Sequence, residues 1–87
     1  MAAALQIWSA TFTRAFDALP ASVRENIRQK VDEMGTRLGS FPHKRLAGRP
    51  EFKLRVGDYR VLYEFNVERG RLLLHYVGNR REIYKRS

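Results

Sequence analysis

The chain contains no cysteine, a single tryptophan and no apolar run long enough to span a membrane. Without cysteine it has no disulfides, thiolate metal ligands or cysteine nucleophiles, and this composition is consistent with a reducing compartment. The first residues, 1–5 (MAAAL), lack the positively charged start of a secretory signal. We therefore expect a cytoplasmic protein with no role at a membrane.

The residue patterns of several enzyme classes are also missing. The two histidines, His43 and His75, lie far apart and have no carboxylate at metal-ligand spacing, so no metal site is predicted. No phosphate-binding glycine loop and no Ser/His/Asp set is recognisable, and no cofactor is expected. His75 is predicted to pair with Glu64 across two strands, and neither histidine is favoured for catalysis.

The positive charge is concentrated in one half of the chain. Its 87 residues allow one domain, 1–87, with a single core. Residues 1–43 hold five Lys and Arg against four Asp and Glu, whereas residues 44–87 hold twelve against five. This distribution indicates a polyanionic partner: a nucleic acid, an anionic membrane or an acidic protein. A membrane is disfavoured because the cations fall on predicted strands and not on an amphipathic helix.

Hydrophobic periodicity predicts two helices followed by a run of strands. Pro20 separates the helices, and Ser22 with Glu25 three residues later fits a capping box at the start of the second one. The predicted elements are a strand at 5–9, helices at 11–19 and from about 21 to 38, a loop at 40–50, and strands at 51–56, 59–67 and from 71 onward. The predicted order is β-α-α-β-β-β.

Residues 52–63 predict a β-hairpin, because Gly57-Asp58 separates two runs of alternating side chains. Pairing Val56 with Tyr59 sorts these side chains onto two faces. The apolar face carries Phe52, Leu54, Val56, Tyr59, Val61, Tyr63 and Phe65. The other, which we call the basic face, carries Lys53, Arg55 and Arg60 together with Leu62 and Glu64.

The basic face is predicted to bind a phosphate. Arg55 lies opposite Arg60, and like charges directly across two strands destabilise a sheet unless an anion joins them. A turn at Arg69-Gly70 would pair Arg60 with Asn79 and bring Arg80 beside Arg60. Such cations can hold a phosphodiester and stabilise developing charge, and RNA supplies its own 2′-OH nucleophile. The simpler alternative is a solvated face without a ligand.

Three segments carry a resemblance to a known family: 45–48 (RLAG), 52–63 (FKLRVGDYRVLY) and 77–84 (VGNRREIY). They resemble the RelE/ParE superfamily of toxins from type II toxin–antitoxin systems, and the RelE branch in particular. The resemblance implies an α+β fold with two N-terminal helices packed on one face of a mostly antiparallel four-stranded sheet. It also implies a ribosome-dependent, metal-free mRNA endoribonuclease that cuts in the A site and leaves a 2′,3′-cyclic phosphate and a 5′-hydroxyl.

The resemblance assigns catalytic roles by position. Arg60 and Arg80 match phosphate-contacting arginines, Lys53 matches a lysine of the active-site face, and Tyr84 matches a C-terminal tyrosine that orients or activates the 2′-OH. The residues expected to bind RNA without doing chemistry are Lys44, Arg45, Arg55 and Arg81. Glu51 departs from the RelE pattern, which has a lysine there, so the resemblance leaves the proton-transfer groups unassigned.

A toxin of this kind implies a cognate antitoxin whose acidic or amphipathic segment covers the basic face or displaces the C-terminal tail. The ribosome and mRNA are the other expected partners, and operator DNA is contacted only through the antitoxin. Two further functions stay open: a ParE-like inhibitor of DNA gyrase without nuclease activity, and a nonspecific RNA- or ribosome-binding module. The set of Arg60, Arg80 and Tyr84 favours the nuclease, since a gyrase inhibitor has no evident need for a phosphodiester site.

Overall fold

The computed structural model describes the backbone of residues 3–86 and the side chains of residues 3–83. Five strands and three helices are present in this part of the chain. Their bounds are β1 Leu5–Trp8, α1 Ala10–Asp17, α2 Ala21–Thr36, β2 Lys44–Arg45, β3 Phe52–Val56, β4 Tyr59–Asn66, β5 Arg71–Asn79 and α3 Arg80–Arg86.

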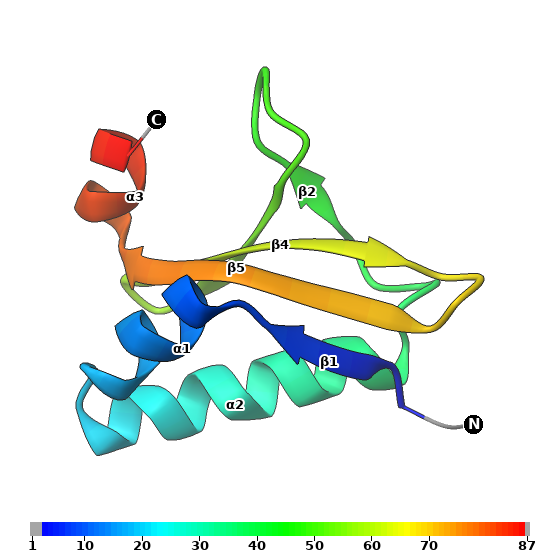
Figure 1. The fold of residues 1–87 in the computed structure, drawn as a ribbon, viewed down its shortest axis with the longest axis horizontal. Coiled ribbons are helices and arrows are strands. Elements are labelled where there is room, and N and C mark those ends of the chain that lie inside the picture. Colours follow the sequence, from blue (N-terminus) through cyan, green and yellow to red (C-terminus); the bar gives the residue numbers. More distant parts are fainter. Residues whose placement is uncertain (1–2, 87) are drawn as a thin grey trace.

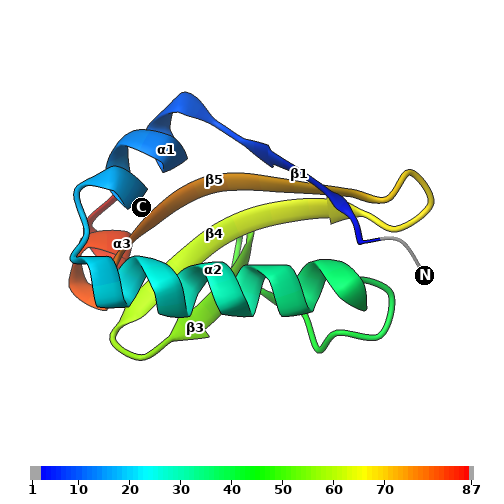
Figure 2. The same cartoon turned by 90° about the horizontal axis from the view of Figure 1, so that it is seen from below.

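The strands form a single sheet in the order β1-β5-β4-β3-β2 (Figure 1). β1 pairs with β5 in parallel, and all other neighbours are antiparallel. α1 and α2 cover one face of the sheet, whereas α3 follows β5 onto the other side (Figure 1; Figure 2). The predicted α+β class is confirmed. The described sheet has five strands where four were predicted, because residues of the predicted loop form the short strand β2, and α3 is an additional helix.

The main core lies between the helix pair and the sheet. Tyr63, Val61 and Leu54 of the hairpin are buried in it, together with Leu72 and Leu74 of β5. The remaining members of the predicted apolar face, Phe52, Val56, Tyr59 and Phe65, are partly buried and pack against the same cluster. The alternation of side chains along the hairpin therefore sorted its two faces as predicted.

Ser9 fixes the start of α1 and ties it to the sheet. Its hydroxyl accepts a hydrogen bond from the backbone N–H of Phe12 at 3.0 Å and donates to the carbonyl oxygen of His75 at 2.9 Å. The preceding Trp8 packs edge-on against the ring of Phe12. Leu5 and Ile7 share a face, as predicted, but it is the face away from α1 and α2, and both side chains are exposed.

The start of α2 differs from the prediction. Pro20 occupies the N-cap position, and no side chain caps the helix. Ser22 therefore lies inside the first turn, and the predicted capping box with Glu25 is wrong. Proline suits this boundary because its fixed φ and missing N–H cost nothing where the helix has no hydrogen bond to lose.

The register of β3 and β4 agrees with the prediction at every pair, from Val56 with Tyr59 to Phe52 with Tyr63. The register of β4 and β5 does not, because Arg60 pairs with Gly78 and not with Asn79. The shift of one residue is the net effect of two features that act in opposite directions. The turn after β4 spans four residues, 67–70, and a bulge interrupts the ladder beside Leu62 and Tyr63.

Candidate functional site

Two cross-strand pairs place four cations on the basic face. Arg55 of β3 lies opposite Arg60 of β4, and Lys44 of β2 lies opposite Lys53 of β3. Directly paired residues of antiparallel strands project from the same face, so the two pairs adjoin. Because like charges across a ladder are unfavourable, the sheet concentrates positive potential where a polyanion can neutralise it.

Arg60 is held in a fixed orientation at the end of the hairpin. The residue is only 9% exposed, and its Nη1 donates to the carbonyl oxygens of Gly57 at 3.0 Å and Tyr59 at 2.9 Å. A guanidinium has five N–H donors. Nη1 supplies two of them to the turn, which leaves Nε and Nη2 as a planar pair of the kind that binds phosphate or carboxylate oxygens.

Arg80 reaches the same end of the sheet by a different route from the one predicted. It is the first residue of α3 and not part of the last strand. Its backbone N–H donates to the carbonyl oxygen of Asp58 in the β3–β4 turn at 2.9 Å. Asn79 ends β5 and its side-chain oxygen accepts from the N–H of Arg81 at 3.0 Å, which caps α3. Arg80 thus lies beside the turn that binds the Arg60 guanidinium, and both Arg80 and Arg81 are exposed.

The structure separates Lys44 from Arg45. Neighbouring residues of a strand point to opposite faces, and Arg45 pairs with Phe52 of the apolar face. Its guanidinium carbon lies 4.7 Å from the centroid of the Phe52 ring, a cation–π contact. Arg45 therefore does not join Lys44 on the basic face. The side chain of Tyr84 lies outside the described residues, so its assigned role stays a prediction.

Glu82, Tyr76 and Gly78 form a close contact that the sequence did not indicate. A Cβ atom placed on Gly78 would lie 2.9 Å from Oε2 of Glu82 and 2.9 Å from Cε2 of Tyr76. Only glycine lets both side chains approach the backbone opposite Arg60, and a glycine inside a strand is the signal that marks such an approach. Leu62 and Ile83 are buried on this side, outside the main core.

His43 is part of the fold and not of the basic face. Its ring stacks on Phe65 at 3.8 Å, and Nε2 lies 2.7 Å from the carbonyl oxygen of Leu38. Since a carbonyl only accepts, Nε2 carries the proton, and Nδ1 accepts from the hydroxyl of Tyr63 at 2.7 Å. Burial raises the pKa of Tyr63 to about 12. Both ring nitrogens are occupied, which leaves none for acid–base chemistry.

Glu51, the departure from the RelE pattern, is an ion-paired carboxylate. Its two oxygens accept from Nε and Nη2 of Arg49, each at 3.1 Å. The hydrogen bond from Arg49 is the main cause that lowers the pKa of Glu51. Glu51 therefore has no proton to give near neutral pH, and it brings a negative charge where the RelE pattern has a positive one.

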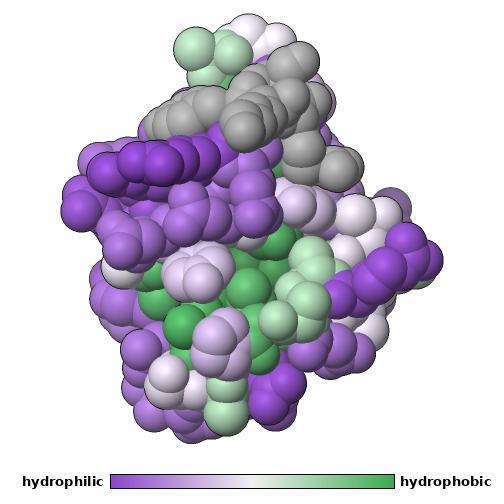
Figure 3. All heavy atoms as spheres, turned by 90° about the vertical axis from the view of Figure 1, so that its left-hand side faces the viewer, coloured by the Kyte–Doolittle hydropathy of each residue, from purple (hydrophilic) through white to green (hydrophobic). Residues whose placement is uncertain are grey.

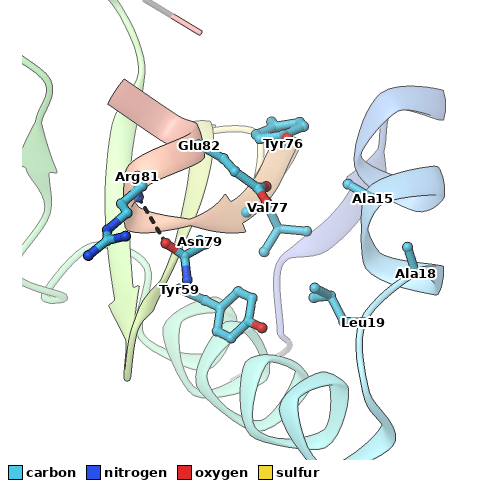
Figure 4. Close-up of a pocket in the computed structure, with 10 residues that line it drawn as sticks. Ala15, Ala18, Leu19, Tyr59, Tyr76, Val77, Asn79, Arg81 and Glu82 are labelled. Carbon is cyan, nitrogen blue, oxygen red and sulfur yellow. Dashed lines mark hydrogen bonds between the residues drawn. The ribbon is translucent and has the colours of Figure 1, made fainter. Parts of the chain in front are cut away.

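A cavity of about 560 Å³ opens at the end of the molecule where α1 meets the start of α3. Figure 4 shows Ala15, Ala18 and Leu19 on one side of it and Tyr59 and Asn79 on the other. This end of the molecule has an apolar floor ringed by hydrophilic residues (Figure 3). Glu82 contributes a carboxylate, so the cavity does not suit a phosphate. Arg81 of α3 also lines it, whereas the four cations of the basic face lie outside it.

The described residues contain no group of three or more His, Asp or Glu side chains placed to hold a metal ion. None of the helices described is both long enough and apolar enough to cross a membrane.

Comparisons with known proteins identify relatives of the whole chain. The family model for the ParE toxin of type II toxin–antitoxin systems matches residues 7–84. No curated protein sequence matches significantly. Among solved structures, the isolated E. coli RelE toxin is similar with a TM-score of 0.75 and 22% identity over 97% of this chain and 98% of that one.

Two toxin–antitoxin complexes contain similar chains. A chain of the intact E. coli RelBE complex has a TM-score of 0.74 and 25% identity, over 88% of this chain and 96% of that one. A chain of the Mycobacterium tuberculosis RelBE2 complex has a TM-score of 0.74 and 20% identity, over 91% of this chain and 93% of that one. These similarities extend over almost the full length of each chain and confirm the predicted RelE-like fold.

Proposed function

Because the chain belongs to the family of ParE toxins of type II toxin–antitoxin systems, we propose that it inhibits translation by cutting mRNA in the ribosomal A site. The 2′-OH of the RNA attacks the adjacent phosphate, the bond from phosphorus to the 5′-oxygen breaks, and a 2′,3′-cyclic phosphate and a 5′-hydroxyl result. The reaction takes place in the cytoplasm, with the ribosome and mRNA as partners and without a metal or cofactor.

One observation carries this proposal: the guanidinium of Arg60 and the backbone N–H of Arg80, twenty residues apart in sequence, both donate to carbonyl oxygens of the β3–β4 turn. Arg60 has the rigidity expected of a group that stabilises a pentavalent phosphate, because a preorganised donor loses nothing to reorganisation during the reaction. Arg80 supplies a second charge to the same phosphate. Lys53 and Tyr84 complete the proposed catalytic set, and Lys44, Arg55 and Arg81 bind the flanking RNA.

A cognate antitoxin is the expected partner of a toxin in this family, and similar chains have been solved in complex with antitoxins from E. coli and M. tuberculosis. We propose that an acidic or amphipathic segment of the antitoxin covers the basic face, where Lys44, Lys53, Arg55 and Arg60 adjoin. Operator DNA is contacted through the antitoxin.

The test is to induce the chain without its antitoxin and to map 5′ ends on a translated message and on the same message with its start codon removed. We expect new 5′ ends only on the translated message. Arg60→Ala should reduce cleavage about 100-fold or more, as expected when a preorganised charge donor is lost. Arg14→Ala, which removes an exposed cation from α1, is the matched control and should cleave normally.

Arg60 also braces the hairpin turn, so its variant needs a check of folding. Arg60→Lys keeps the charge but cannot reproduce the planar pair of donors. A folded Arg60→Lys protein with wild-type cleavage would contradict the role given to the guanidinium.

Inhibition of DNA gyrase is the second candidate function, because the matching family model describes ParE toxins. It predicts supercoiling defects with intact message after induction. A nonspecific RNA- or ribosome-binding module predicts salt-sensitive binding with no cleavage in either message.

A further inference from the structure

The bulge in β5 is centred on His75. Leu74 pairs with Tyr63 and Tyr76 pairs with Leu62, so His75 has no partner in the ladder. A bulge leaves one residue unpaired and changes the direction of its side chain, and bulges are common beside active sites. Here the bulge brings Nε2 of His75 to 2.7 Å from Oε2 of Glu64.

This histidine–carboxylate pair lies on the basic face, next to Lys53 of the proposed catalytic set. Glu64 is two residues from Leu62, which pairs with Lys53. Glu64 is therefore a diagonal neighbour of Lys53, at a Cα separation of about 7–8 Å. The side chains of His75 and Glu64 are 33% and 45% exposed, so a ligand on this face can reach both.

The hydrogen bond between Glu64 and His75 orients the imidazole as in a general base. Glu64 as a carboxylate accepts from Nε2, which fixes the proton on that nitrogen and leaves the lone pair of Nδ1 available. Among the described residues, no hydrogen bond to Nδ1 of His75 is found. A carboxylate that orients an imidazole and stabilises its charged form is the arrangement that activates hydroxyl nucleophiles.

The surrounding charges are mixed. Continuing the β3 register by one residue places Glu51 across from Glu64, with Arg49 bound to Glu51. On β1 the neighbouring side chains, Leu5 and Ile7, are apolar, and Glu82 of α3 lies over Gly78, further along β5.

We propose that His75, positioned by Glu64, is the general base of the cleavage, an assignment that rests on the proposed function. The proton of the 2′-OH passes to Nδ1 of His75 as the 2′-oxygen bonds to phosphorus. The bond from phosphorus to the 5′-oxygen breaks, and the ammonium of Lys53 protonates the leaving oxygen. Exchange with water then returns both groups to their starting states.

The test is single-turnover cleavage of mRNA on programmed ribosomes, measured at several pH values. The wild-type rate should rise with pH, because a general base accepts a proton only in its unprotonated form. His75→Gln retains a donor for Glu64 but cannot act as a base, so it should lose about 100-fold in rate and the imidazole-dependent rise. Glu64→Gln should lose less and show a displaced pH profile.

Glu33→Gln is the matched control, because Glu33 on α2 pairs with Arg37 and lies on an exposed helix surface. It should leave rate and profile unchanged. If His75→Gln cleaves like the wild type while Arg60→Ala does not, the assignment of the base is overturned and the nuclease stands. If the wild type cuts nothing, both proposals are overturned. Nitrogen NMR of the wild type gives a check without a variant: a proton on Nδ1 and not on Nε2 would also overturn the assignment.

Discussion

At the scale of single residues, Tyr63 and His43 show how the core constrains its polar groups. Tyr63 is completely buried, yet its hydroxyl donates to Nδ1 of His43, and Nε2 of the same ring donates to the carbonyl oxygen of Leu38. A phenol in this position is stable only in its neutral form, because ionisation would place a charge in the core. The raised pKa of Tyr63, about 12, is the result.

This shift predicts a loss of stability at alkaline pH. Below pH of about 10 the phenol is neutral in both the folded and unfolded states. As the pH rises from about 10 toward 12, the unfolded phenol ionises first, and the free energy of unfolding falls by up to about 1.4 kcal/mol per pH unit. Denaturant unfolding of the wild type and of Tyr63→Phe at several pH values measures this alkaline loss of stability. The Tyr63→Phe variant should not show the part of the loss that comes from ionisation of Tyr63.

Tyr63→Phe should cost about 1 kcal/mol at neutral pH, because Nδ1 of His43 loses its donor. The control is Tyr59→Phe at the edge of the cavity, which should keep the alkaline loss because Tyr63 is retained. Parallel alkaline slopes for the wild type and Tyr63→Phe would contradict the assignment to Tyr63.

The sequence predicted the residues of the basic face and missed those that depend on distant contacts. Period-two alternation was enough to place Lys53, Arg55 and Arg60 together. It could not show that the Arg60 guanidinium turns back to Gly57, because that depends on side-chain rotamers. The contact of His43 with Tyr63 joins a loop to a strand twenty residues away and leaves no periodic signal.

At the scale of elements, the β3–β4 hairpin positions the proposed site. Its turn contains Gly57 at a φ of +60°, a backbone conformation that residues with a Cβ rarely adopt. The carbonyl of Gly57 accepts from Arg60, and that of Asp58 accepts from the N–H of Arg80. The backbone of this turn therefore organises both arginines.

Gly57→Ala should destabilise the protein by about 1 kcal/mol and reduce cleavage by more than this stability loss explains, because the turn carbonyls move. Gly39→Ala is the control: Gly39 has no positive φ, and an added Cβ would make only an ordinary contact with Val67 at 3.5 Å. Thermal unfolding and the 5′-end assay measure the two effects. Equal stability and equal cleavage in the two variants would show that the geometry of the β3–β4 turn does not position the site.

Elements with a strong local pattern were predicted well, and those made by tertiary contacts were not. Both amphipathic helices and the hairpin follow from periodicity and turn residues. β2 has only two residues, too few for any periodic signal, and exists because it pairs with β3. The bulge at His75 and the longer turn after β4 shifted the last register, and neither has a clear sequence signature.

At the scale of the whole molecule, the uneven distribution of charge along the sequence concentrates positive charge on one face of the sheet. The strand-rich second half carries +7 of the net +8, and four of its cations adjoin on the basic face. Binding to RNA should therefore weaken steeply with salt, since each phosphate contact releases condensed counterions.

Lys44→Ala should reduce the slope of log K against log salt for a single-stranded RNA oligonucleotide by about 0.7, the value for one phosphate contact. Arg14→Ala removes the same charge from α1 on the helical side and should leave the slope unchanged. Fluorescence anisotropy at four or more salt concentrations measures both. Identical slopes for the two variants would mean that net charge, and not the basic face, attracts the RNA.

The position of β5 has a consequence for synthesis. This strand lies between β1 and β4, so β1 has no partner in the sheet until β5, more than sixty residues later in the chain, has been made. Contacts so distant along the chain form late in folding. A nascent chain of this protein therefore cannot complete its sheet before residues 71–79 have been made, and the surfaces built on that sheet form only after this strand.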